Sequence, residues 1–332
     1  MDLALFQDHF HLTTLTQAIN NLVEPNYFLS GLNLFEEKPV DTTTVGVEFR
    51  DGQITLVASK PRGSSDGTTP TGYTRGQPKI LQAVHLPVKD EILADVVQNI
   101  RSFGTTSELE SLQAKVNERL SLMRKSIDAT LEYHRWGALN GQVLDADGTT
   151  VLLNLFDFFG LTKPANRIID FADAKVDLQV MEASDAVDDV LNGATRGGFI
   201  ALCGRDFNNQ FHASKALKDD VRLLRDGEQA RNDMRSAYQY KDITFYRCTE
   251  KIAGKYMVAP DEALLIPTGV DGMFNMRFAP GDYVETVNTP GLPYYATVEP
   301  KKHNKGFDFE AQSNPITWCS RPHAIQRLKL KA

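Results

Sequence analysis

The chain has 332 residues and a formal charge of −7, from 36 lysines and arginines against 43 aspartates and glutamates. Its length predicts about two domains of roughly 150 residues each. Its 42% hydrophobic and 24% charged residues are typical of a globular protein, which excludes wholesale disorder. No run approaches the roughly 18 apolar residues of a membrane span, and residues 1–20 lack the basic start and apolar centre of a signal peptide. We therefore expect a soluble chain that is not exported by that route.

The arm at the start of the chain, residues 1–40, mixes short apolar patches with prolines. Four apolar residues recur at helical spacing: Leu12, Leu15, Ile19 and Leu22. We expect this N-terminal arm to pack on the rest of the molecule.

Residues 41–85 are predicted to form one long hairpin, an extended loop. Apolar and polar residues alternate over 45–49 and again over 54–58, which is the period of a half-buried strand. Residues 60–78 then hold four glycines and three prolines and offer little for a core. Because apolar residues return over 80–88, we interpret 60–78 as a flexible tip between two strands, and loops of this length are usually functional.

Two helices are predicted next, over residues 92–103 and 107–136. Ser107 and Glu110 have the spacing of a capping box, and Arg135 would complement the helix dipole at the far end. The second helix would be about 40 Å long at 1.5 Å per residue. Its apolar residues step by three or four: Leu109, Leu112, Val116, Leu120, Met123, Ile127 and Leu131. Such a rod suggests a spine for the fold.

The second half of the chain begins with a predicted hairpin over 142–153, turned at Asp147-Gly148, a pair that tolerates the positive φ of a tight turn. An acidic helix is expected to end near Gly193. Apolar, β-branched and aromatic runs then predict strands over 199–203, 243–246, 256–258 and 263–266. The fold class is therefore α+β, with helices and antiparallel strands and no repeating βαβ pattern.

Charge is distributed unevenly along the chain. Residues 170–189 hold seven acidic residues against one lysine, residues 50–89 hold six basic against two acidic, and four basic residues follow position 320. The net acidity argues against a protein whose main task is to bind DNA, because that affinity comes largely from Lys and Arg on phosphates. Either these charges form a solvated surface, or opposite patches meet between copies of the protein.

The search for an active site finds no specific motif. Residues 63–67 match the G-x-S-x-G pattern, which makes a serine hydrolase using Ser65 one alternative. The serine lies in the glycine- and proline-rich tip, where the rigid turn that this chemistry needs is not predicted. His9 and His11 lack further metal ligands nearby, and the three cysteines lack the spacing of a zinc or disulfide framework. We predict no catalysis, no metal and no cofactor, and buried thiols in a reducing compartment.

Two consecutive segments carry a family resemblance: residues 264–280, LLIPTGVDGMFNMRFAP, and residues 281–296, GDYVETVNTPGLPYYA. They resemble the major capsid proteins of tailed bacteriophages in the lambda-like branch, and the order of arm, extended loop, spine helix, small hairpin and second domain agrees over about residues 10–330. The resemblance implies the Hong Kong 97-type capsid fold. It also implies a peripheral domain over 86–160 and 286–332 and an axial domain over 161–285.

The resemblance implies a structural protein, not an enzyme, that assembles into an icosahedral head around double-stranded DNA. Expected partners are copies of itself in hexamers and pentamers, a separate scaffolding protein, a portal and possible decoration proteins, with no membrane. The expected location is the virion, and the host cytoplasm during assembly. Contacts between copies are expected at basic residues of the extended loop and acidic residues of the next copy: Lys60, Arg62, Arg75, Lys79, Asp185, Asp188 and Asp189. The shell of an encapsulin-like nanocompartment, which has the same fold, remains an alternative.

Overall fold

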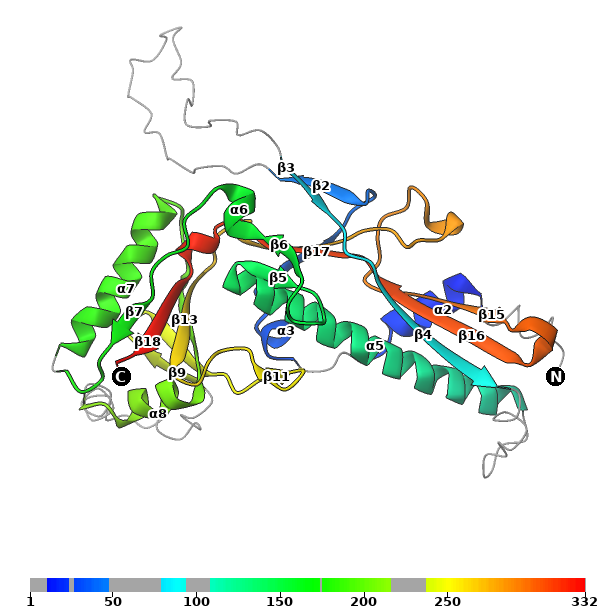
Figure 1. Cartoon of the computed structure of the whole chain (residues 1–332), viewed down its shortest axis with the longest axis horizontal. Coiled ribbons are helices and arrows are strands. Elements are labelled where there is room, and N and C mark those ends of the chain that lie inside the picture. The colour runs from blue at the N-terminus through cyan, green and yellow to red at the C-terminus, as the bar shows by residue number, and fades with distance from the viewer. Residues whose placement is uncertain are drawn as a thin grey trace, which may run out of the picture. The chain divides into compact units, whose positions relative to one another are not determined.

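The structure, a computed structural model, describes residues 11–23, 27–47, 79–93, 108–173, 175–215 and 237–331 (Figure 1). The chain divides into two compact units, each assembled from three stretches of sequence. The first unit comprises Met1–Val47, Ile80–Arg135 and Asn275–Trp318, and the second comprises Glu48–Lys79, Trp136–Phe274 and Cys319–Ala332. Residues far apart in sequence therefore build each core.

The first unit contains most of the long helix α5, Glu108–Asn140. Its 33 residues correspond to about 50 Å at 1.5 Å per residue. The predicted apolar stripe is confirmed from residue 113 onward, since five of its members are buried: Val116, Leu120, Met123, Ile127 and Leu131. The helix continues past Gly137, where the sequence predicted its end.

Two short helices precede the first strand: α2, Leu12–Asn20, and α3, Phe28–Leu32. The helical spacing predicted in the arm is confirmed by α2, which buries Leu15 and Ile19. This helix packs on strand β15, Tyr295–Pro300. The arm is thus part of the first unit's core over the residues described.

Strand β15 belongs to an antiparallel sheet with β16, Gly306–Ser313, and β4, Leu86–Leu93. The helix predicted from residue 92 is wrong at its start, because Ile92 and Leu93 pair with β16. Ile92 is buried and Leu93 is exposed, so the two follow the alternation of a strand. Pairing with a distant strand overrides the local helical spacing here, and residues 94–103 lie outside the described residues.

A second sheet of the first unit joins β1, Glu36–Pro39, β14, Phe274–Phe278, and β17, Pro315–Cys319. The base of the predicted hairpin is confirmed, since β2, Thr44–Val47, pairs with β3, Lys79–Gln82. The predicted strand over 54–58 and the tip over 60–78 lie outside the described residues.

The second unit is centred on a six-stranded sheet. From one edge of the sheet to the other, the strands are β7 (Arg167–Ile169), β18 (Gln326–Leu330), β13 (Glu262–Thr268), β8 (Gly198–Cys203), β10 (Ile243–Arg247) and β9 (Ala237–Tyr240). Strands β10 and β8 pair in parallel, as do β18 and β7. The antiparallel strands expected from the sequence are present, but the sheet is mixed because it also contains these two parallel pairs. Helix α8 lies between β8 and β10 in the chain, and a long connection of this kind permits their parallel pairing.

Two helices pack on this sheet: α7, Val176–Leu191, and α8, Arg205–Ala213. Helix α7 is the predicted acidic helix, and it ends where Asn192 and Gly193 adopt positive φ. In α8, Phe211 stacks on Phe245 of β10 with ring centroids 4.1 Å apart.

The unit also contains α6, Leu155–Phe159, and two small hairpins. One pairs β5, Gln142–Leu144, with β6, Val151–Asn154, and confirms the turn predicted at Gly148, which has a φ of 69°. The other pairs β11, Lys251–Ile252, with β12, Lys255–Tyr256.

Short 3-10 turns complete the two units, over Val284–Thr286 and Lys302–Asn304 in the first and over Pro322–Ala324 in the second.

Candidate functional site

The basic residues predicted to contact another copy lie mostly outside the described residues: Lys60, Arg62 and Arg75, together with Ser65 of the alternative hydrolase. Lys79 is described, and it is the first residue of β3. Its Nζ donates a hydrogen bond to the carbonyl oxygen of Phe158 and lies 5.5 Å from the centre of that ring. Lys79 thus contacts α6.

The acidic residues predicted for the same contact all lie on α7 and are exposed: Asp185, Asp188 and Asp189. Asp188 already has a partner within the chain, because Arg196 donates to its two oxygens over 2.6 and 2.8 Å. Arg196 is held in turn over the ring of Phe199, 4.0 Å from its centre. Within the described residues, Asp185 and Asp189 form no ion pair, and none of the three contacts Lys79.

The basic residues at the end of the chain also bind carboxylates within the second unit. Lys329 pairs with Asp261 at 3.4 Å and Lys331 with Asp170 at 2.8 Å. The hydrogen bond from Lys331, joined by the backbone N–H of Ala172, lowers the pKa of Asp170. The charges of Lys329 and Lys331 are thus neutralised within one copy.

A row of buried charges on α5 was missed by the sequence analysis. Arg124 is 3% exposed and donates to the carbonyl oxygens of Ile19 and Leu22, each at 2.7 Å. Both carbonyls lie at or just beyond the end of α2, where helical carbonyls lack intrahelical partners and favour a cation. Arg124 is also 3.4 Å from Asp128, which accepts a hydrogen bond from Tyr294.

Two turns further along α5, Glu132 is fully buried and caps the start of α3. Its carboxylate accepts from the backbone N–H groups of Leu29, at 2.6 Å, and Ser30, at 3.2 Å. Arg135 donates to Glu132 at 3.1 Å and to Glu37 at 2.6 Å. Burial alone would lower the pKa of Arg135, but the two carboxylates outweigh it and raise that pKa.

These four residues, which we call the arm clamp, are Arg124, Asp128, Glu132 and Arg135. Opposite charges three or four residues apart, as in Arg124–Asp128 and Glu132–Arg135, are also the pattern of ion pairs on an exposed helix face, so the sequence offers no signal that separates the two. The structure corrects the role predicted for Arg135. The last turn of α5 has no basic residue, and Arg135 binds carboxylates instead of complementing the helix dipole.

The described part of the chain contains no group of three or more His, Cys, Asp or Glu side chains that could hold a metal ion. Nor does any described helix combine the length and apolar character that crossing a bilayer requires. His11 accepts or donates a hydrogen bond with Thr14 at 3.1 Å, while His9 lies outside the described residues.

Comparison with known proteins gives a consistent result. Residues 11–330 match the family model of phage major capsid protein E. The major capsid protein of Salmonella phage Felix O1 is 23% identical, covering 98% of both chains, and that of Pseudomonas phage KPP10 is 24% identical, covering 97% of both.

Among solved structures, a prophage protein of Escherichia coli CFT073 described as a capsid protein superimposes with a TM-score of 0.60. It is 14% identical, and the alignment covers 97% of this chain and 99% of that one. This similarity concerns the fold. With the family match over nearly the whole length, it shows that the chain belongs to the phage major capsid protein E family and has the Hong Kong 97-type capsid fold.

Proposed function

We propose that many copies of this chain close into the icosahedral head of a tailed phage, around double-stranded DNA. The family match over residues 11–330 carries the proposal, because it assigns nearly the whole chain to a structural phage protein and leaves no segment for a separate catalytic domain in that range. The family is one of phage heads, so it favours the head over the cellular nanocompartment. The chain is accordingly a structural component of the virion.

The surface of the isolated chain supports assembly. Several large apolar side chains are strongly exposed: Val23 at 95%, Val284 at 87%, Ile80 at 70%, Ile168 at 65% and Val287 at 64%. Burying apolar surface is the main driving force of association. A shell formed from many modest interfaces gains its stability through multivalency, so no single patch needs to be large.

The finer organisation is also part of the proposal. Residues 1–40 would form the N-terminal arm, 41–85 the extended loop with its tip at 60–78, 86–160 with 286–332 the peripheral domain, and 161–285 the axial domain. Assembly would take place in the host cytoplasm with a separate scaffolding protein and a portal, and decoration proteins could bind the finished shell.

In the extended loop, Lys60, Arg62, Arg75 and Lys79 would bind acidic groups of a neighbouring copy, with Asp185, Asp188 and Asp189 as candidate partners. Asp185 and Asp189 suit this role better than Asp188, because Arg196 already binds Asp188 within the chain. Reversing the charge at Arg62 and Arg75 is expected to reduce assembly. Unchanged assembly would count against this pairing and leave the head function standing.

The central experiment is assembly of the purified protein at increasing concentration, with and without a co-expressed scaffolding protein. Negative-stain microscopy and sedimentation are expected to show closed particles of uniform size. A chain that remains monomeric at every concentration and with every scaffold would overturn the proposal.

A further inference from the structure

Helix α7 presents a surface that has no partner among the described residues. Its buried side faces the sheet, while Leu178 and Met181 on the other side are 51% and 49% exposed. Three exposed carboxylates continue the same face at steps of three or four residues: Glu182, Asp185 and Asp189. In the described part of the chain none of these three forms an ion pair. We call these five residues the outer face of α7.

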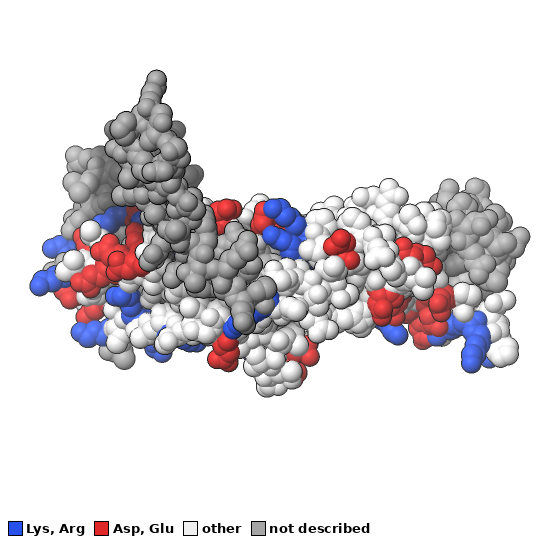
Figure 2. Space-filling model, turned by 90° about the horizontal axis from the view of Figure 1, so that it is seen from above, with Lys and Arg blue, Asp and Glu red and all other residues white. Residues whose placement is uncertain are grey.

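The charge of this face is costly for an isolated molecule. Residues 176–191 hold five acidic side chains and no basic one, and Figure 2 shows the acidic side chains gathered where α7 lies. Like charges three or four residues apart on a helix repel one another. A partner that offers positive charge together with apolar surface would relieve the repulsion and cover Leu178 and Met181.

The β11–β12 hairpin of the same unit has the complementary character. Lys251 and Lys255 are both exposed, and neither forms an ion pair among the described residues. Tyr256 is 38% exposed, and the Nζ of Lys251 lies 4.2 Å from the centre of its ring. The hairpin reverses direction in a tight turn at Ala253 and Gly254, whose φ angles are 49° and 78°. The exposed Lys251 and Lys255 lie on either side of this turn.

Arg205, the first residue of α8, lies near Tyr256. It is positioned by Gly204, where a Cβ atom would lie 2.0 Å from the carbonyl oxygen of Ala259. Arg205 is paired with Asp206 at 3.0 Å, so the uncompensated charge comes from the two lysines.

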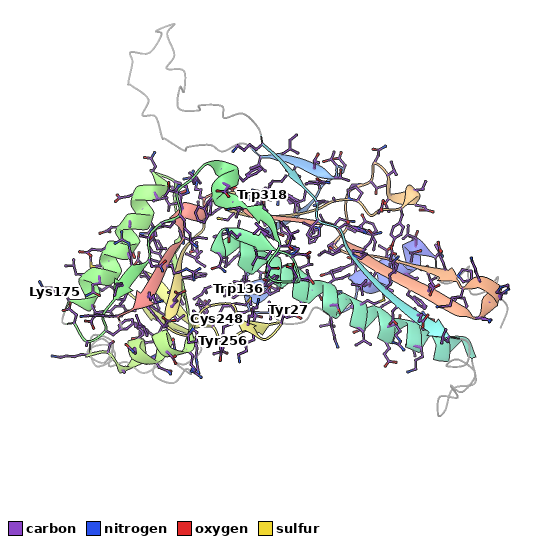
Figure 3. All side chains as sticks on the ribbon, in the orientation of Figure 1. Tyr27, Trp136, Lys175, Cys248, Tyr256 and Trp318 are labelled. Atoms are coloured by element: carbon purple, nitrogen blue, oxygen red, sulfur yellow. The ribbon has the colours of Figure 1, made fainter. Side chains whose placement is uncertain are left out.

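Figure 3 places Lys175, which precedes α7, and Tyr256 of the hairpin on separate sides of the second unit. No ion pair joins the outer face of α7 to Lys251 or Lys255 within the described residues of one copy. We propose that the outer face of α7 binds the β11–β12 hairpin of the next copy. For Asp185 and Asp189 this contact takes the place of the pairing with the extended loop, whose basic residues then bind other acidic groups of the neighbouring copy. The contact uses different surfaces on the two partners, and such a heterologous contact forms a ring when the rotation between neighbouring copies closes. The inference rests on the proposed shell function and specifies one of its contacts.

Charge reversal tests the contact. Asp185→Lys with Asp189→Lys, and separately Lys251→Glu with Lys255→Glu, are each expected to lower the yield of particles several-fold. All four substitutions together are expected to restore much of it, because the charges are then exchanged between the two surfaces. Lys163→Glu, an exposed lysine of the same unit, serves as control and should leave the yield unchanged. Circular dichroism of each unassembled variant checks that it folds.

Two results would overturn the inference: assembly of both reversed variants at the wild-type yield, or a quadruple variant no better than the poorer of the two. If the wild-type chain itself forms no particles, the shell function fails instead, which keeps the two failures distinct.

A cysteine pair provides a second readout. The three native thiols are buried, and burial raises the pKa of Cys319 to about 12, so the native background is inert. Asp185→Cys combined with Lys255→Cys is expected to give, on oxidation of particles, a ladder of covalent oligomers on a denaturing gel. Each single variant should remain monomeric. Dimers from Asp185→Cys alone would mean that α7 of one copy contacts α7 of another. Well-formed particles that give no ladder would mean that the hairpin does not lie at α7 of the next copy. Either result contradicts the proposed contact.

Discussion

Arg124 and Glu132 recognise the backbone of the arm and not its side chains. Arg124 binds carbonyls at the end of α2, and Glu132 binds N–H groups at the start of α3. Each charge has the sign that the nearby helix dipole favours. The contacts fix where α2 ends and α3 begins whatever side chains the arm carries, provided that its backbone keeps the same path.

Replacing Arg124 with methionine is expected to destabilise the first unit strongly. The side-chain volume is largely kept, but three backbone carbonyls lose their donor and the buried Asp128 loses its counter-charge. Removing one partner of a buried pair typically costs about 3–5 kcal/mol. Chemical denaturation of the unassembled protein measures the loss. Lys125→Ala, at the neighbouring exposed position, is the control and should change stability by less than about 0.5 kcal/mol.

Asp147, at the turn of the β5–β6 hairpin, predicts a dependence on pH. The Thr150 hydroxyl, at 2.6 Å, and the N–H groups of Thr149 and Thr150 stabilise its carboxylate and lower its pKa below the ordinary 3.8. A lowered native pKa adds stability above the unfolded value, and that stability is lost as pH falls through the native one.

The unfolding midpoints of the wild type and of Asp147→Asn are therefore expected to differ by a constant amount between pH 7 and 5. The difference should shrink below pH 3.8, the ordinary value for this carboxyl. A difference that stays constant or grows as the solution is acidified would contradict this assignment.

At the scale of elements, the apolar pattern predicted α5 and its buried stripe, but Gly137 led to the wrong end. Glycine usually marks a helix end, yet here a Cβ atom would lie 2.8 Å from both the Gln142 carbonyl oxygen and the Val143 Cα. The glycine is required by the close return of β5, a contact that local sequence cannot reveal. Pairing of Ile92 with β16 was hidden for the same reason, since it depends on residues more than 200 positions away.

The acidic residues of α7 illustrate how far the candidate site could be predicted. Their exposure followed from the apolar period of the helix, which buries Val180 and Val187 instead. Asp188 is already bound by Arg196, which lies eight residues further along the chain, after a turn. Asp185 and Asp189 are exposed to solvent. Sequence proximity alone does not distinguish among three neighbouring aspartates on one helix.

Gly137→Ala is expected to destabilise the second unit although alanine is the better helix former. Propensity favours alanine by about 1 kcal/mol, but the added methyl group forces β5 away from α5, and overpacking of this kind costs about 1–3 kcal/mol. The matched control is Gly46→Ala in β2, where no atom lies within 4 Å of the new Cβ. Denaturation midpoints should fall for the first variant and stay unchanged or rise for the second.

For the whole molecule, the distribution of partners separates folding from assembly. The described cations at the end of the chain and the arm clamp are paired within one copy, which stabilises the fold. The outer face of α7 and the exposed side chains of Val284 and Val287 do not stabilise the fold in this way. Substitutions in the first group should therefore act on the free energy of unfolding, and those in the second on the yield of particles.

The loop over 281–293 offers the sharpest test of that separation. Its backbone is held in place, since Thr286 donates to the Gly281 carbonyl oxygen at 2.6 Å and the Leu292 N–H donates to the Tyr295 hydroxyl at 2.8 Å. Val284 nevertheless projects almost fully into solvent. A fixed loop that exposes an apolar side chain is typical of a surface that another molecule covers.

Val284→Asp is accordingly expected to change the stability of the unassembled protein by less than about 0.5 kcal/mol, while particle yield falls several-fold because a charge must then be buried without a partner. Asn288→Asp is the matched control, since it adds the same charge to the same loop at an exposed polar position. Denaturation and sedimentation measure the two effects side by side. Equal losses for both variants would show that charge alone disturbs assembly, and a stability loss from Val284→Asp would show that the valine serves the fold.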